Sequence, residues 1–330
     1  MNGYPRRQRG IALLIALLTV ALAAILIAGL LDRGELALAR TRNALRSEQA
    51  EAYAQGLESY AAQILLKDYS DDSGAIDTNS DIWASPMPPQ PVPGGLISAT
   101  ARDLNGCFNL NNLTPSGSNS SEWHRAFQRL LDARGVARDV ADAVIAWLNG
   151  ASEADNSDAY YLSLPVPYRS ARRSFAHVSE LRLVRGVDSD VYARLAQYVC
   201  ALPPGTRINI NTASVPVLQA LVEGLTQGQA ESLWQNGTAH WTVDTFTTQL
   251  RQLLGRPSLG PSLNNLISPD SSYFLARGDI TLDGVAFTFY SLIERRLAHG
   301  ADSGIRVLER SRGSDDALAV GVRNAVAGNR

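Results

Sequence analysis

The sequence predicts an α+β fold: a long N-terminal helix packed on a small antiparallel sheet, with a large all-α domain inserted into that sheet. Three observations predict this class. An uncharged apolar run at 11–31 continues without proline into a helical pattern that reaches Leu66. Alternating segments at 96–113 and 273–296 carry turn signals and indicate hairpins. The stretch between them has helical patterns instead, which indicates an inserted domain.

Composition excludes several classes of protein. The 330 residues are 45% hydrophobic and 19% charged, which predicts about two globular domains and excludes a disordered tail or a multi-span membrane protein. A net charge of -2 gives no electrostatic reason to expect nucleic acid as the main partner. Two cysteines and four histidines leave little material for zinc or iron–sulfur sites. Because common catalytic motifs are missing from the sequence, we expect no enzyme activity.

The N-terminal segment decides the compartment. Ile11 to Leu31 carry no charge, and the run is long enough to cross about 30 Å of hydrocarbon as a helix. Arg6, Arg7 and Arg9 precede it, so the positive-inside tendency places the N-terminus in the cytoplasm and the bulk of the chain outside. A secretory signal peptide is disfavoured, because no small-residue cleavage site follows the run. A plain single-span anchor is the simplest alternative.

Composition and periodicity divide the rest of the chain. We expect a linker and the first strands at 67–115, the inserted helices at 116–270, the closing strands at 271–312 and a loose tail at 313–330. The prolines from Pro86 to Pro93 exclude helix and central strand. The predicted helices of the insert are Ser121–Ala133, Arg138–Leu148, Ser179–Arg185 and Ser189–Val199. The predicted closing strands are Phe274–Ile280, Val285–Glu294 and Gly304–Leu308.

Two segments of the insert, 179–199 and 209–234, resemble helix-hairpin-helix units. Their turns contain Gly186 and Gly224, which can supply the positive φ that a tight turn requires. Such units bind phosphate through backbone amides in DNA repair proteins. Because the second unit carries no lysine or arginine before Arg251, we interpret both units as packing scaffold and not as a DNA-binding surface.

Cys107 and Cys200 are the only cysteines, and both lie in the part predicted to be exported. An isolated pair in an oxidising compartment favours a disulfide, which would fasten the insert to the sheet. Two buried free cysteines are the alternative.

One predicted loop of the insert carries several oxygen ligands. The residues concerned are Asn149, Glu153, Asp155 and Asp158. Hard oxygen ligands in a flexible loop suit Ca²⁺, so we expect one calcium ion there, or at most two. A solvated acidic loop is the alternative. The other acidic stretch, 68–81, is interpreted as linker.

The N-terminus carries a family resemblance. A basic leader, 1–10, ends in Gly10, and the membrane and stalk helix, 11–66, begins at once with Ile11. This arrangement is similar to the class III signal of type IV pilins and type II secretion pseudopilins. The resemblance implies cleavage after Gly10 by prepilin peptidase, methylation of Ile11, and a pilin-like fold.

Further features resemble one branch of that family, the large minor pseudopilin K of type II secretion systems. Ile15 stands where most members carry a glutamate, and absence of that glutamate is characteristic of the tip subunit. The cysteine contexts and the paired hairpin units are also similar. Tyr160 and Tyr161 match the end of the family's calcium loop, but Asn149 replaces a usual aspartate and the loop is shortened.

The resemblance implies assembly, not chemistry. The subunit would lie in the inner membrane with its bulk in the periplasm of a Gram-negative bacterium, and would contact the inner-membrane assembly platform. With minor pseudopilins I and J and the other pseudopilins it would nucleate and cap a filament that supports export of folded proteins across the outer membrane. No nucleic acid is expected. Two alternatives stay open: an exported, membrane-anchored DNA-binding or receptor protein, and a minor pilin of a type IV pilus.

Overall fold

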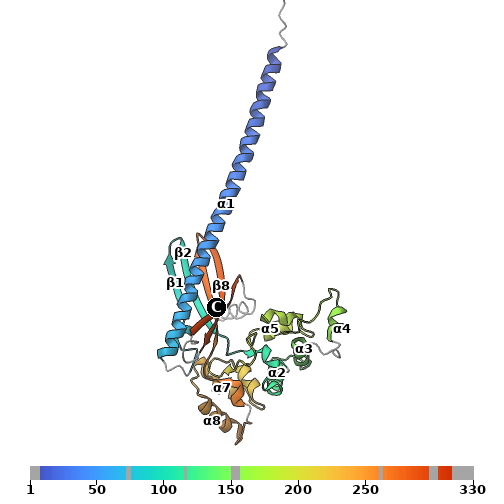
Figure 1. Ribbon diagram of the computed structural model, residues 1–330, viewed down its shortest axis with the longest axis vertical. Coiled ribbons are helices and arrows are strands. Elements are labelled where there is room, and N and C mark those ends of the chain that lie inside the picture. The colour runs from blue at the N-terminus through green and yellow to red at the C-terminus, as the bar shows by residue number, and fades with distance from the viewer. Residues whose placement is uncertain are drawn as a thin grey trace, which may run out of the picture. The chain divides into compact units, whose positions relative to one another are not determined.

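The computed structural model describes residues 8–71, 76–114, 117–149, 157–259, 263–296 and 304–313 (Figure 1). The chain forms two compact units, residues 1–53 and 54–330, and the boundary between them falls within the first helix. Each unit is described by itself.

Helix α1 runs from Gln8 to Asp71 as one continuous element of 64 residues. No proline interrupts it, and its apolar and charged residues are mostly good helix formers. The predicted helix is therefore present, and it ends at Asp71, beyond the predicted end at Leu66.

The second unit contains a five-stranded antiparallel sheet with the order β1-β2-β7-β8-β9. The bounds are β1 Met87–Val92, β2 Gly95–Asp103, β7 Tyr273–Leu282, β8 Val285–Arg296 and β9 Gly304–Arg312. The predicted turn between β7 and β8 is confirmed, since Asp283 and Gly284 both have positive φ, 47° and 80°. Strand β1 was not predicted as a strand, but its three prolines lie at the sheet edge, where missing N–H groups are tolerated.

The last part of α1 packs on one face of this sheet. Leu65 joins a buried cluster with Trp83, Phe274 and Ile293. Gly278 lets the helix approach closely, because a Cβ there would lie 2.9 Å from a methyl carbon of Leu57. Apolar burial therefore holds this segment on the sheet.

Glu58 adds a polar link between α1 and the sheet. Its carboxylate accepts hydrogen bonds from Ser291 at 2.8 Å and from two nitrogens of Arg310 at 2.7 and 2.8 Å. Burial alone would raise the pKa of Glu58, but these hydrogen bonds lower it below its usual value.

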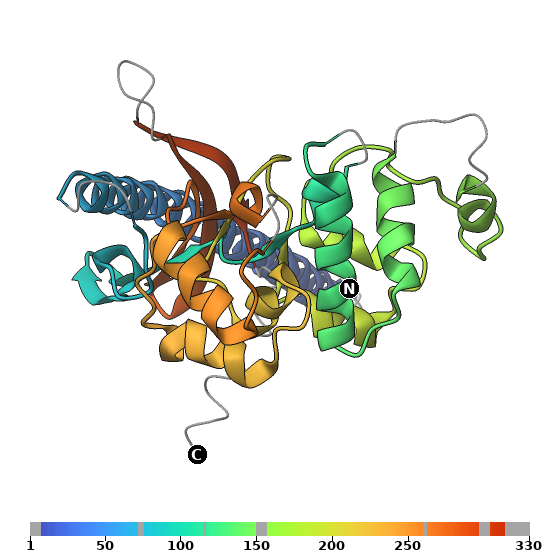
Figure 2. The same ribbon diagram turned by 90° about the horizontal axis from the view of Figure 1, so that it is seen from below.

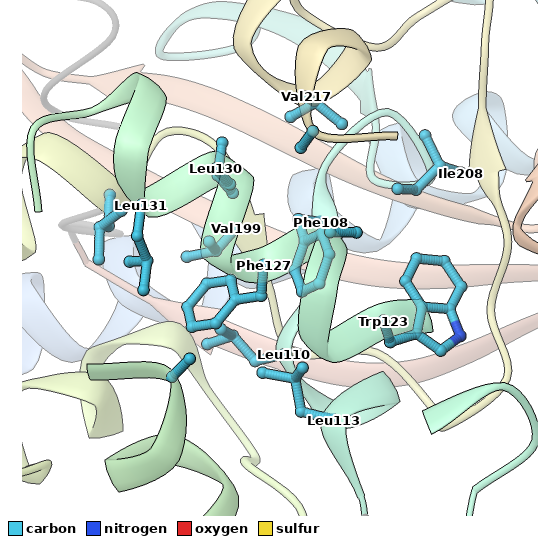
Figure 3. Close-up of a cluster of buried hydrophobic side chains, with 14 of the residues drawn as sticks. Phe108, Leu110, Leu113, Trp123, Phe127, Leu130, Leu131, Val199, Ile208 and Val217 are labelled. Atoms are coloured by element: carbon cyan, nitrogen blue, oxygen red, sulfur yellow. The ribbon is translucent and has the colours of Figure 1, made fainter. Parts of the chain in front are cut away.

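The insert leaves the sheet after β2 and returns at β7, two strands that pair along their full length from Gly95–Leu282 to Asp103–Phe274. Its elements are α2 Ser120–Ala133, α3 Asp139–Leu148, α4 Ser157–Leu162, α5 Ser189–Leu195, α6 Val215–Leu221, α7 Gln227–Trp234, α8 Val243–Leu254 and α9 Leu263–Leu266, with the short strands β3 Phe108–Asn109, β4 Val199–Cys200, β5 Ile208–Asn209 and β6 Ile267–Ser268. Aromatic and aliphatic side chains fill its core (Figure 3). Phe108 stacks on Phe127 at 5.1 Å and meets Trp123 edge-on at 5.6 Å.

Two predicted helices of the insert were partly wrong. The segment predicted at 179–185 is a 3-10 helix, Val178–Leu183. It ends at Leu183 because Val184 is extended and Gly186 has a φ of 83°. The helix predicted at 189–199 ends at Leu195, and Val199 begins the strand β4. Parallel pairing of β4 with β3 replaces the predicted helical turn.

The insert consists of two similar halves, each closed by a pair of parallel two-residue strands. The halves begin with the related segments 108–112 and 208–212. In the first, the Asn111 amide exchanges hydrogen bonds with the backbone of Phe175, at 2.7 and 3.0 Å. In the second, the Asn211 amide does the same with Trp241, at 2.5 and 3.0 Å. The same buried asparagine clamp therefore fastens each half.

Candidate functional site

The apolar run of α1 presents its side chains outward. Every large aliphatic residue from Ile11 to Leu31 is between 53% and 68% exposed within the chain. In the described part of the chain, this is the one helix that is long and apolar enough to cross a membrane. Such an exposed apolar surface requires an apolar environment or partner helices.

The predicted processing and filament-packing residues all lie on this helix. Gly10 and Ile11 are adjacent in its first turns, and Ile15 is 57% exposed. No carboxylate occurs between Ile11 and Leu31. The surface that would face other helices in a membrane therefore carries no buried charge that needs a partner.

Arg295 forms the centre of a buried polar junction in the second unit. Its guanidinium donates to the carbonyl of Leu65 at 3.3 Å and to the carbonyl of Ser271 at 2.9 Å, and it pairs with Asp77. The side chains of Arg295 and Asp77 are only 1% and 4% exposed. One cation thus ties together the end of α1, the linker and the returning end of the insert.

Asp77 keeps a raised pKa in this junction. Burial is the main cause, and the hydrogen bond and charge of Arg295 oppose it without cancelling it. The backbone N–H of Ser271 donates to the same carboxylate at 2.7 Å.

Asp103 lies at the point where the chain leaves the sheet. It accepts hydrogen bonds from the N–H of Asn105 at 2.7 Å and from the hydroxyl of Thr212. Burial raises its pKa to about 6 despite these bonds. The amide oxygen of Asn105 in turn accepts from the N–H of Tyr273 at 2.9 Å, so both ends of the insert are held together.

The predicted disulfide is present. Cys107 and Cys200 are bonded, with 5.9 Å between their Cα atoms, and they link the residue before β3 to the end of β4. They pack with Leu104 and Leu202 against the face of the sheet. The bond therefore fastens the first half of the insert close to where it leaves β2.

The predicted calcium loop is only partly described. Glu153 and Asp155 lie outside the described residues. Asn149 is an exposed residue at the C-terminal end of α3. Asp158 pairs with Arg172 at 2.7 Å and accepts from the N–H and hydroxyl of Ser170 at 3.3 and 3.2 Å. Its carboxylate is therefore already neutralised by arginine, which sequence spacing did not indicate.

A second acidic group was missed by the sequence analysis, which treated it as linker. Carboxylate oxygens of Asp68, Asp77 and Asp81 lie within 4.8 Å of one another. Arg295 contacts two of these carboxylates, at 3.8 Å from Asp68 and directly at Asp77. Asp81 instead accepts from the backbone and hydroxyl of Thr78, at 2.7 Å each. The group therefore works as a structural junction, and its central cation comes from the far end of the sequence.

The turns of both hairpin-like units have the predicted glycine conformation, with φ of 83° at Gly186 and 84° at Gly224. Arg256 reaches the second turn and donates to the carbonyl of Glu223 at 3.2 Å. In the first turn, Arg185 lies over the ring of Tyr160 at 5.6 Å. Arg256 thus makes a hydrogen bond within the chain, whereas Arg185 makes a ring contact and stays exposed.

Comparison with known proteins adds to this geometry. Two family models described as type II secretion system protein K match residues 106–204 and 208–261. Two curated proteins named type II secretion system protein K are similar over most of their length. The one from Pseudomonas aeruginosa is 34% identical, covering 93% of this chain and 94% of that protein. The one from Pectobacterium carotovorum is 32% identical, covering 93% and 97%.

A solved structure is also similar. A chain in the crystal structure of the GspK-GspI-GspJ complex of the enterotoxigenic Escherichia coli type 2 secretion system superposes with a TM-score of 0.70 at 29% identity. The match covers 84% of this chain and all of that one.

Proposed function

The chain belongs to the protein K family of type II secretion systems, and from this premise we propose that it is the minor pseudopilin at the tip of the pseudopilus. In this proposal it nucleates and caps the filament together with minor pseudopilins I and J, and so supports export of folded proteins across the outer membrane. The observation that carries the proposal is the exposed, uncharged surface of α1 from Ile11 to Leu31, in a chain of which 84% matches a chain of the GspK-GspI-GspJ complex.

Processing after Gly10 is the first step of the proposal. Prepilin peptidase would remove residues 1–10 and methylate Ile11, which leaves the apolar run as the N-terminus. The mass and N-terminal sequence of the protein from membranes test this in strains with and without the peptidase. A chain that begins at methylated Ile11 only when the peptidase is present supports the proposal. A Met1 start in both strains would leave an anchored periplasmic domain.

Capping depends on Ile15. A carboxylate within the bilayer costs about 2.5–3.5 kcal/mol on insertion scales unless it finds a partner, and a subunit with no neighbour above it lacks that partner. We therefore expect Ile15→Glu to reduce secretion of a marker protein, whereas Ile15→Leu should not. Unchanged secretion by Ile15→Glu, with normal amounts of the protein in the membrane, would argue against the tip position.

The partners follow from the same proposal. The apolar face of α1 would pack against the corresponding helices of I, J and other pseudopilins, after extraction by the inner-membrane assembly platform. The N-terminus would be cytoplasmic, because Arg6, Arg7 and Arg9 precede the run, and the sheet and insert would be periplasmic. A disulfide joining Cys107 to Cys200 is in keeping with an oxidising compartment.

Calcium binding in the insert is a separate proposal. One or two ions would be held by Asn149, Glu153, Asp155 and Asp158. The described residues fit such a site only in part, because Arg172 already neutralises Asp158. We therefore assign the main ligand role to Glu153 and Asp155. Calorimetry should show calcium binding that is lost when both are changed to alanine and that is weaker but still present in Asp158→Asn; a titration unaffected by the double change would refute the assignment.

DNA binding is the competing function that the hairpin units suggest. The second unit has no lysine or arginine between Ile208 and Arg251, and Arg256 at its turn is engaged with the backbone of Glu223, which favours a structural role. Retention of the periplasmic domain on heparin at moderate salt would favour the competing function. The tip proposal predicts no retention.

A further inference from the structure

The exposed apolar residues of the insert gather at one place. Within its described part, every large apolar side chain that is well exposed lies in or near α4. They are Tyr160 at 40%, Leu162 at 45%, Val166 at 79% and Leu183 at 44%. We call these four residues the α4 patch. Figure 2 shows α4 at the outer edge of the insert, beyond α2 and α3, where the insert itself does not cover it.

Aromatic packing and hydrogen bonds hold the α4 patch on the insert. The ring of Tyr161 packs edge-on against Trp147 at 5.4 Å and lies 5.3 Å from Tyr168. The Tyr168 hydroxyl donates to the carbonyl of Leu183 at 2.8 Å, and the N–H of Arg185 donates to the Tyr161 hydroxyl at 3.2 Å. These bonds join the α4 segment to the Leu183 segment, so the surface is one unit.

Val166 protrudes between Pro165 and Pro167. Both prolines restrict φ, so the backbone on either side of the valine has little freedom to lose when a partner binds. A large aliphatic side chain that is 79% exposed on such a segment is a preorganised anchor.

The rim of the patch is positively charged. The side chains of Arg169 and Arg173 are 73% and 60% exposed, and Arg185 is exposed beside Tyr160. The two carboxylates described nearby are already engaged. Asp158 is 14% exposed; it pairs with Arg172 at 2.7 Å and lies 3.8 Å from Arg169. Glu180 is 19% exposed; it accepts from the backbone N–H of Ala176 at 2.8 Å and lies 3.8 Å from Arg173. Because these two contacts are long and the arginine side chains are mostly exposed, the guanidinium groups can still donate to further carboxylates.

From this arrangement we propose that the α4 patch binds an acidic protein segment that carries large apolar side chains. Apolar side chains of the partner would cover Leu162 and Val166, and its carboxylates would form paired hydrogen bonds with Arg169 and Arg185, the geometry that guanidinium groups favour. Four apolar residues held on a rigid base match the central anchor of a protein interface more closely than a surface that inserts into lipid. This inference goes beyond the tip function and does not depend on it.

Photo-cross-linking tests the proposal in the full-length protein in secreting cells. A photoreactive amino acid replaces Val166, and the control replaces Val285, which is 40% exposed at the start of β8. We expect a protein adduct at 166 and none at 285, with the cross-linked peptide acidic and rich in apolar residues. The combined change Arg169→Ser and Arg185→Ser should lower the yield at least about fivefold, while Arg256→Ser should not.

Four outcomes would overturn the proposal. They are no adduct above the level at 285, an adduct with lipid only, an adduct with a neutral or basic segment, and a yield that the two arginine changes leave unaltered. The variants are checked for the intact disulfide, so that misfolding is not mistaken for lost binding.

Discussion

Replacing Asp103 with asparagine should remove much of the pH dependence of the free energy of unfolding between about pH 4.5 and pH 7.5. The folded-state pKa of Asp103 is about 6, above the ordinary value of 3.8, because the carboxyl is buried. The folded state therefore binds the proton more tightly than the unfolded state. Stability from this group is fully present at low pH and is lost as the pH rises from about 4 to about 6.

The size of the effect follows from the two pKa values. A difference of about 2 units corresponds to about 3 kcal/mol, of which about 2 kcal/mol is lost between pH 4.5 and pH 7.5. An asparagine keeps the oxygen that accepts from Asn105, and its NH₂ can donate to the hydroxyl of Thr212. It does not titrate, so its unfolding free energy should lack this change.

Urea unfolding of a soluble form without the apolar run measures the difference at the two pH values. Thr212→Val is the matched variant, because it removes a hydrogen bond that lowers the pKa of Asp103 and should make the pH dependence steeper. If the asparagine variant keeps the pH dependence of the parent, the charge of Asp103 is not its source. If it is strongly destabilised at pH 7.5, the carboxylate is required and the reasoning fails.

Three further predictions concern the same unit. Replacing Cys107 and Cys200 with serine should lower the free energy of unfolding by about 4–5 kcal/mol in the chain-entropy model, because the bond closes a separation of 93 residues; denaturant titration with and without reductant measures this. Arg295→Met should cost about 3–5 kcal/mol because it leaves Asp77 buried without its partner, and adding Asp77→Asn should recover part of the loss; strictly additive effects in a double-mutant cycle would contradict this. Gly95→Ala should lower the melting temperature sharply, since a Cβ would lie 1.7 Å from a carbonyl oxygen of β7, whereas Gly228→Ala has open space and should not.

Patterns within one segment predicted most of the fold. The continuous helix α1 and the hairpin at Asp283 and Gly284 are visible from local periodicity and turn chemistry, and the structure confirms both. The two-residue strands that close each half of the insert were not predictable, because two residues carry no period. Their pairing depends on contacts between segments such as 108–109 and 199–200. The proline-rich strand β1 was missed for a different reason, since its prolines are tolerated only because it lies at an edge.

The polar sites show the same limit. The disulfide was predictable because only one pair of cysteines exists. The partners of the carboxylates were not, because they come from distant or unpatterned positions. Arg295 reaches Asp77 across 218 residues, and Arg172 reaches Asp158 in α4 from a following segment that forms no helix or strand. Sequence spacing pointed to a group of acidic residues, but only the fold shows which cation Asp77 and Asp158 meet.

Because the two ends of the insert are neighbours, the length and sequence of the insert can vary without changing the sheet. The N–H of Leu104 donates to the carbonyl of Tyr273 at 2.9 Å, so residues 104 and 273 meet like the two ends of a hairpin turn. In the topology of the sheet, the whole insert is therefore one very long loop that connects the paired strands β2 and β7. Closing a flexible loop becomes only about 0.6 kcal/mol harder with each doubling of its length. Segments can therefore be lost, gained or exchanged within the insert while the β2–β7 register stays the same, and a short turn grafted between these strands should leave the sheet able to form.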